Sequence, residues 1–372
     1  MIVTILAFVI ILSVLVVIHE LGHFLVAKKL GIKVEEFGIG FPPKAFSKKI
    51  GETVYSINWL PVGGFVKLFG EDEAGGGKIG KQGTGSRGQR TEGDEVERAY
   101  YARPLWQRMA VVTAGVIMNV ILAIGLISFL FATQGVPLPT DTIIVTEVAP
   151  SSPAAIAGIQ KNDRIVKIDG KQIKTTELFI TETKKLRGQE VTLIVKRGDQ
   201  QFTTKLTPRV NSPKNQGAMG VAISNIEVKK YSWLEAPFFG TIEAAKFSWM
   251  IASGLGGMIG DFVLHGTKPQ GVAGPIGVAQ LTGEAVRAGW FAVLWFMALL
   301  SLNLAVLNIL PIPALDGGRF FFMIIEMFTR KKVSPKYEAY AHGVGLVLLL
   351  GLMAVVTLLD IVRLLQGKSI IP

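Results

Sequence analysis

Four long runs of uncharged, apolar residues constrain the fold of this 372-residue chain more than any other feature. A helix needs about 20 apolar residues to cross the hydrocarbon core of a bilayer. Only 18% of the residues are charged, against about a quarter in soluble domains. The sequence therefore predicts a polytopic α-helical membrane protein with four transmembrane helices. The runs are Met1–Ile18 continued by Leu21–Ala27, Met109–Ala132, Trp290–Leu310, and Gly343–Leu359 extended by Ala339–His342.

The first apolar run is predicted to remain as a spanning helix. A secretory signal peptide begins with basic residues and ends at a small-residue cleavage site. Here no Lys or Arg precedes Lys28, and the run ends in His19-Glu20-Leu21-Gly22-His23. Both features favour a membrane helix over a cleaved signal.

The basic residues indicate how the helices are oriented. The chain has 39 Lys and Arg against 28 Asp and Glu, a net charge of +11. Many of these basic residues lie in the loops 28–108 and 319–336, and cytoplasmic loops of membrane proteins are rich in Lys and Arg. We therefore expect these loops to face the cytoplasm, and both termini and residues 134–287 to lie outside the plasma (inner) membrane. No nucleic-acid-binding motif accompanies the basic residues, so nucleic acid is not an expected partner.

The segments between the helices differ in composition. Residues 31–70 are rich in glycine, aromatic and β-branched residues, with turn signals at Phe41-Pro42-Pro43 and Lys49–Gly51, which indicates membrane-associated β-hairpins. Residues 71–104 are Gly-rich and charged, as in a flexible cytoplasmic linker. Residues 210–287 are predicted to form a juxtamembrane amphipathic region. The helical segments are expected at 1–30, 105–133, 288–318 and 339–365.

Residues 141–209 have the pattern of a compact α+β domain: strand, short helix, strand, amphipathic helix and final hairpin. With the string SPAAIAGIQKNDRIVKIDGKQI (Ser152–Ile173), this order resembles a PDZ domain. PDZ domains bind extended chain ends by adding a strand to a sheet edge. The resemblance implies an inserted extracytoplasmic domain that either binds a peptide tail or blocks access to the membrane site sterically, and the sequence favours neither.

The residues that indicate chemistry form an HExxH motif in the first helix. His19 and His23 are four residues apart, so both imidazoles lie on one face and can reach one metal ion. Glu20 lies beside them, where it can take a proton from a metal-bound water. The alternative, a pair of packing histidines, would place costly ionisable groups inside a membrane. We therefore predict a zinc (Zn²⁺) site.

A hydrolytic zinc site needs a third protein ligand and one open position. The chain has no cysteine, and Lys29 stands where an extended HExxHxxGxxH motif has its third histidine. We expect His265 outside the membrane and His342 in the cytoplasmic turn into the fourth helix. Asp316, in NLAVLNILPIPALDGGR, is the best candidate, with a helix cap as its alternative. Asp360 is expected at the opposite, outer end.

These motifs together resemble a known family. HExxH in the first helix, a PDZ insert and the pattern NxxxxNxxPxPxLDG near the third helix resemble the bacterial site-2 proteases of the RseP type, over nearly the whole chain. The resemblance implies an intramembrane zinc metalloprotease in which His19, His23 and Asp316 hold Zn²⁺ and Glu20 is the general base.

Two further assignments follow from the resemblance. Asn303 and Asn308 match the asparagines that bind the unwound backbone of the substrate, although such amides also form hydrogen bonds between membrane helices. Residues 33–70 resemble hairpins that hold the substrate as an added strand.

The sequence departs from the family in two places. The family usually has Gly-Pro before the asparagine of the second helix, whereas this chain has Gly115-Val116 before Asn119. The best-known member has two PDZ domains, and this chain has room for one. The first departure concerns the fine geometry of the second helix, and the second concerns gating and substrate choice.

The expected activity is hydrolysis of peptide bonds in or near the transmembrane segments of single-pass membrane proteins. These substrates, such as anti-sigma factors or signal-peptide remnants, are expected to have been trimmed already on the outer side. The other expected partners are the lipid bilayer and a peptide tail at the PDZ domain. A non-catalytic scaffold and a divalent-metal transporter are the rival functions, and the intact Glu20 and Asp316 argue against the scaffold.

Overall fold

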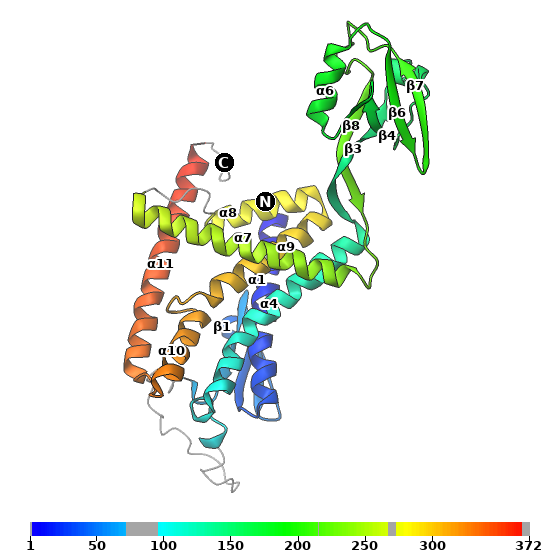
Figure 1. Ribbon diagram of the computed structural model, residues 1–372. Coiled ribbons are helices and arrows are strands. Elements are labelled where there is room, and N and C mark those ends of the chain that lie inside the picture. The colour runs from blue at the N-terminus through cyan, green and yellow to red at the C-terminus, as the bar shows by residue number, and fades with distance from the viewer. Residues whose placement is uncertain (1, 72–95, 215, 267–272, 367–372) are drawn as a thin grey trace. The chain divides into compact units, whose positions relative to one another are not determined.

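The computed structural model describes residues 2–71, 96–214, 216–266 and 273–366 (Figure 1). Most of the predicted linker, residues 72–95, lies outside the described residues. The chain forms two compact units, one made of residues 1–130 and 233–372 and the other of residues 131–232. The first unit contains the apolar helices, and the second is the inserted domain.

The first unit is built on the four predicted helices. Among the described residues, four helices are long and apolar enough to cross a membrane. Many of their apolar side chains face outwards; Val347 and Leu348 on the last helix are 70% and 68% exposed. Such a surface is stable against lipid, because acyl chains are as apolar as these side chains. The helices are α1 (Ile2–Lys29), α4 (Leu105–Thr133), α9 (Trp290–Ile309) and α11 (Pro335–Leu365).

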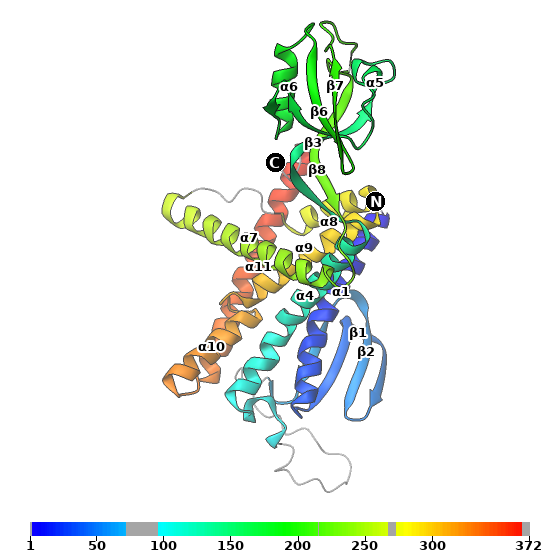
Figure 2. The same ribbon diagram turned by 45° about the vertical axis from the view of Figure 1, so that its right-hand side comes forward.

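A β-hairpin packs along α1 (Figure 2). Strands β1 (Val34–Ile50) and β2 (Thr53–Leu68) are antiparallel, and Gly38 and Ser47 both lie opposite Ser56. Strand β1 must therefore double back between Gly38 and Ser47, which includes the turn signal at Phe41-Pro42-Pro43. The second reversal is at Gly51, as the sequence indicates.

Ion pairs of Glu52 connect the hairpin to Lys28 at the end of α1 and to Arg98. Glu52, in the turn between β1 and β2, accepts hydrogen bonds from Arg98 at 2.7 Å and from Lys28 at 3.1 Å. The Arg98 guanidinium lowers the pKa of the Glu52 carboxyl to about 2. Glu52 is therefore ionised at neutral pH, so this connection persists there.

The third apolar run ends in a break. Helix α9 stops at Ile309, and α10 (Asp316–Thr329) begins at Asp316. Pro311 and Pro313 lie between them, and proline cannot continue a helix because it lacks the N–H and fixes φ. Asp316 is therefore the first residue of a new helix, α10.

Two more helices complete the first unit, α7 (Ala236–His265) and α8 (Pro275–Ala288). They occupy much of the region predicted to be amphipathic. Helix α8 packs against α1, α9 and α11. Asp360 of α11 is fully buried and accepts the Gly277 N–H at 3.0 Å, so this carboxylate fastens α11 to the N-terminus of α8.

The second unit runs further along the chain than the expected 141–209. Strand β8 (Val221–Lys229) pairs with β3 (Val136–Val148) and forms the sheet edge in the order β7-β6-β4-β3-β8. Strand β8 lies beyond the expected end at residue 209; in the sequence it follows a run of turn-forming residues, and it is recognisable only through its distant partner β3. The remaining elements are α5 (Pro153–Ile156), β4 (Arg164–Ile168), β5 (Lys171–Gln172), α6 (Thr176–Lys185), β6 (Val191–Arg197) and β7 (Gln200–Leu206).

Candidate active site

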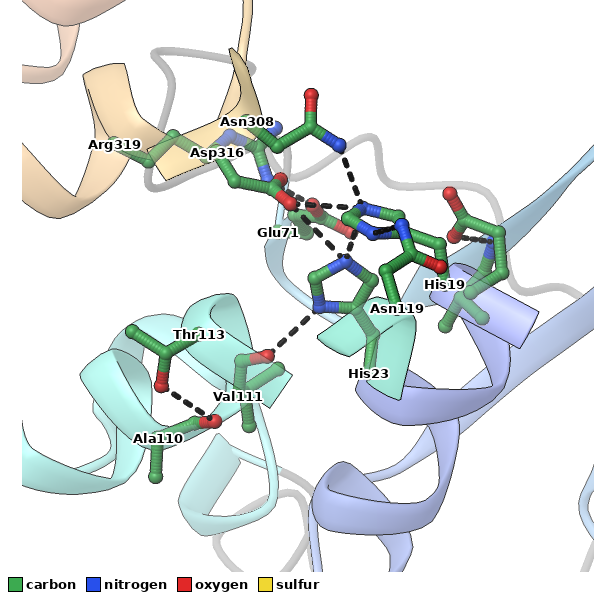
Figure 3. Close-up of polar contacts among 12 residues, drawn as sticks. His19, His23, Glu71, Ala110, Val111, Thr113, Asn119, Asn308, Asp316 and Arg319 are labelled. Carbon is green, nitrogen blue, oxygen red and sulfur yellow. Dashed lines mark hydrogen bonds and ion pairs between the residues drawn. The ribbon is translucent and has the colours of Figure 1, made fainter. Parts of the chain in front are cut away.

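Three ligand atoms from two distant segments converge inside the first unit. Nε2 of His19 lies 3.2 Å from Nε2 of His23, one helical turn away on α1. Oδ2 of Asp316 lies 2.9 Å from the first of these nitrogens and 3.3 Å from the second (Figure 3). The structure therefore brings together the three residues that the sequence analysis named as metal ligands, although 297 positions separate His19 from Asp316.

The spacing of these atoms fits zinc. Tetrahedral ligands at about 2.0–2.2 Å from Zn²⁺ lie roughly 3.3–3.5 Å from one another. The observed separations of 2.9–3.3 Å need only a small outward movement to reach that geometry. Two imidazoles and one carboxylate leave the fourth position open, as in catalytic zinc sites.

A cavity of about 480 Å³ opens beside the three ligands. His23 and Asp316 line it, and Glu20 is on the same wall. Oε2 of Glu20 accepts the backbone N–H of Val66 on β2 at 3.1 Å. The hairpin thus fixes one oxygen of this carboxylate.

Helix α4 orients both imidazoles through their other nitrogens. Nδ1 of His23 donates to the backbone oxygen of Val111 at 2.8 Å, which places the proton on Nδ1 and leaves the Nε2 lone pair for a metal. Nδ1 of His19 lies 3.2 Å from the amide group of fully buried Asn119. The Asn119 Oδ1 has no hydrogen-bond partner among the described residues. Rotating this amide by half a turn lets Oδ1 accept from His19 Nδ1–H, which leaves the Nε2 lone pair of His19 for a metal.

Gly115 allows α4 to approach the two rings. A Cβ at this position would lie 2.7 Å from Cε1 of His19 and closer still to Nε2 of His23. Val111, Gly115 and Asn119 are four residues apart and share one helical face. No role at the site was predicted for this face from the sequence, although Gly115 and Asn119 belong to the family pattern of the second helix. Val116, where the family usually has proline, lies within the continuous helix α4.

The two asparagines of α9 lie in different environments. The Asn308 amide nitrogen is 3.3 Å from His19 Nε2 and is buried, so Asn308 belongs to the cluster. The Asn303 amide donates to the carbonyl oxygen of Leu299 one turn earlier in its own helix, at 3.2 Å. The structure therefore brings Asn308, but not Asn303, into contact with the predicted ligands.

The other histidines also differ from one another. His265 is an exposed residue at the end of α7, near Asp261. His342 was expected where the chain enters the fourth helix, predicted at 339–365; it lies within α11, which begins at Pro335, and it lines the cavity. The helix begins earlier than the apolar run indicated because Pro335 is well placed in its first turn.

Comparison with known proteins identifies the family. The model of peptidase family M50 matches residues 7–352. The chain belongs to this family. It is 38% identical over 350 residues to a putative zinc metalloprotease of Clostridium perfringens, covering 94% of this chain and 96% of the relative. It is 32% identical over 424 residues to the regulator of sigma-W protease RasP of Bacillus subtilis, covering 97% and 99%.

Among the solved structures that match, two PDZ domains each cover 24% of this chain. The PDZ domain of an SdrC-like protein from Listeria monocytogenes is 25% identical, covering 24% of this chain and 93% of that one, with a TM-score of 0.21. The M50 protein described here is accordingly a membrane zinc metalloprotease of the site-2 type with Zn²⁺ as its cofactor.

The close approach of α4 can be tested with a matched pair of variants. Gly115→Ala places a methyl group against both imidazoles, so we expect zinc retention and peptidase activity to fall roughly 10-fold or more. Gly125→Ala makes the same change on the same helix, where a Cβ meets nothing within 4 Å. It should behave as wild type. Zinc content after dialysis is the measurement, and equal content in both variants would contradict the prediction.

Proposed function

We propose that this enzyme hydrolyses peptide bonds in or near the membrane-spanning segments of single-pass membrane proteins. The observation that carries the proposal is the convergence of His19, His23 and Asp316 beside Glu20, with both histidines on an apolar helix long enough to cross a bilayer. A site of this kind meets substrates that are themselves in the membrane. The Bacillus subtilis relative is named as a regulator of sigma-W, so anti-sigma factors are the first substrate class to examine.

In the proposed mechanism, His19, His23 and Asp316 are the zinc ligands. Bound zinc supplies Lewis-acid chemistry, acidifying a water molecule and polarising the scissile carbonyl. Glu20 Oε1 takes a proton from the water while Val66 N–H holds Oε2 in place. A C–O bond forms at the carbonyl carbon, the C–N bond breaks, and Glu20 returns the proton to the leaving amine.

Asn303 and Asn308 are proposed to bind the unwound substrate backbone. A helical peptide bond becomes accessible only when its local hydrogen bonds open, and the released groups need partners in an apolar surrounding. The Asn308 amide reaches His19 Nε2, so it can serve the peptide nearest the zinc. Asn303 would have to exchange its hydrogen bond to Leu299 for one to the substrate.

The role of Glu20 is tested by Glu20→Gln in purified enzyme. This change keeps the shape of the side chain but removes the base, so zinc should stay bound while cleavage of a model single-pass substrate falls by at least about 100-fold. Cleavage is followed by gel electrophoresis in detergent or liposomes. Asp316→Asn is the comparison, because it should lose zinc as well as activity. Full turnover by Glu20→Gln would contradict the mechanism.

We propose that the zinc site lies near the cytoplasmic side, with both termini and the inserted unit outside the plasma membrane. The basic loops support this orientation. The chain has no cysteine, so single-cysteine labelling in intact cells has no background from the enzyme itself. Lys49→Cys in the hairpin should be protected from an impermeant maleimide, and Asp199→Cys in the inserted unit should be labelled. The reverse pattern would overturn the orientation.

The inserted unit is proposed to bind a peptide tail. Edge strand β8 and helix α6 border a cavity of about 220 Å³, lined by apolar residues that include Phe179 and Ile223. Lys184 and Arg187 add positive charge to the lining. A peptide added along an edge strand gains backbone hydrogen bonds, and a terminal carboxylate would meet the basic residues.

Peptide binding is measured with the full-length enzyme in detergent. A fluorescent decapeptide ending in valine should bind more tightly when its carboxylate is free than when it is amidated. Lys184→Glu should abolish that difference, because it reverses a charge in the groove. Failure of the wild type to bind either peptide would instead favour the steric-filter role.

A further inference from the structure

Helix α11 contacts the break between α9 and α10 at two places. His342 Nδ1 accepts the backbone N–H of Ala314 at 2.8 Å. One turn later, Gly345 packs against Pro313, where a Cβ would lie 2.5 Å from the proline oxygen and Cβ. Both contacts fall on the short segment 310–315, which turns the chain into Asp316 (Figure 1).

The backbone of this segment is in an unfavourable conformation that needs support. Ala314 has φ of 80°, in the left-handed region that is unfavourable for a residue with a Cβ. Its N–H would be left without a backbone acceptor by the helix break, and the His342 ring supplies that acceptor. Only Leu315 separates Ala314 from Asp316, so a change in the turn would move the carboxylate directly.

We propose that His342 is a positioning residue for the zinc site. Helix α11, through His342 and Gly345, would hold the turn that fixes the position of the third ligand, Asp316. The imidazole fixes Ala314, the turn fixes the start of α10, and Asp316 Oδ2 thereby meets Nε2 of His19. This inference rests on the proposed role of Asp316 as a zinc ligand. It gives α11 a function in metal binding without any direct contact with the metal.

The protonation of His342 is set by this contact. Because Nδ1 accepts a hydrogen bond, the proton of the neutral ring is on Nε2. Nε2 has no hydrogen-bond partner among the described residues, and the nearest carboxylate oxygen, of Glu338, is 4.0 Å away. The two ring nitrogens can therefore be separated by substitution, since only Nδ1 is engaged with the turn.

The glycine contact supplies the cleanest test. Gly345→Ala should push α11 away from Pro313 and lower zinc affinity roughly 10-fold, the size expected when support for a metal ligand is lost. Gly343→Ala, two residues earlier on the same helix, adds its methyl group where nothing lies within 4 Å and should retain zinc as wild type does. Zinc affinity is measured by chelator competition in detergent, without any peptidase assay. Equal affinities for both variants would overturn the proposal.

The histidine contact is tested with a second pair. His342→Asn keeps an acceptor close to the position of Nδ1 and should retain most of the zinc affinity, whereas His342→Leu should lose roughly 10-fold or more. His265→Leu removes an exposed histidine as a control. If His342→Asn and His342→Leu are equally impaired, or neither is, the imidazole does not act through Ala314 and the proposal fails.

Two further measurements are needed. The first shows whether a loss of zinc affinity comes from general destabilisation, and the second shows whether the proposed role of Asp316 as a zinc ligand holds by itself. The thermal midpoint of the metal-free protein should be similar in His342→Asn and His342→Leu, so that the difference between their zinc affinities does not come from general destabilisation. Asp316→Asn is titrated with zinc in parallel. If Asp316→Asn loses zinc while Gly345→Ala and His342→Leu keep it, the proposal that α11 positions Asp316 is wrong, and the assignment of Asp316 as a zinc ligand stands. If Asp316→Asn keeps zinc, both fail.

Discussion

The structure of this enzyme depends on keeping polar groups paired inside an apolar bundle. The side chains of His19, His23 and Asp316 are only 7%, 12% and 23% exposed, and an unpaired polar group shielded from water costs about 2–7 kcal/mol. Their close approach, with separations of 2.9–3.3 Å, makes a site that a divalent metal can complete. The histidines can share one face because α1 is a regular helix, whereas the carboxylate can reach them only because the third apolar run is broken.

Each neighbouring element supplies one restraint to this cluster. Helix α4 offers a backbone carbonyl from Val111 and the amide of Asn119 to the two imidazoles. Strand β2 holds the Glu20 carboxylate through Val66 N–H. The hairpin that lies along α1 is therefore connected to the carboxylate that we propose as the general base.

Much of the site could be predicted from local patterns. HELGH has the i, i+4 spacing of a helical metal site. The prolines before Asp316 indicate a helix break that would expose its carboxylate. Other parts had no such signal. Asn119 matches the asparagine of the family's second helix, but no local pattern shows that it reaches His19, and His342 directly precedes the apolar run that starts at Gly343. Strand β8 was missed because it follows a turn-rich segment and pairs with a strand that lies about 80 positions earlier, and pairing of this kind is non-local.

The sequence by itself determined the four apolar helices, the family and the identity of the histidine pair, because hydrophobic run length and helical period are local properties. Only the tertiary structure decided that Asp316 meets His19, that Asn308 joins them while Asn303 bonds within its own helix, and that His342 faces the cavity and holds Ala314. These contacts depend on how closely helices approach and on the exact turn between α9 and α10. Such distances follow from packing of distant segments, which no single stretch of sequence contains.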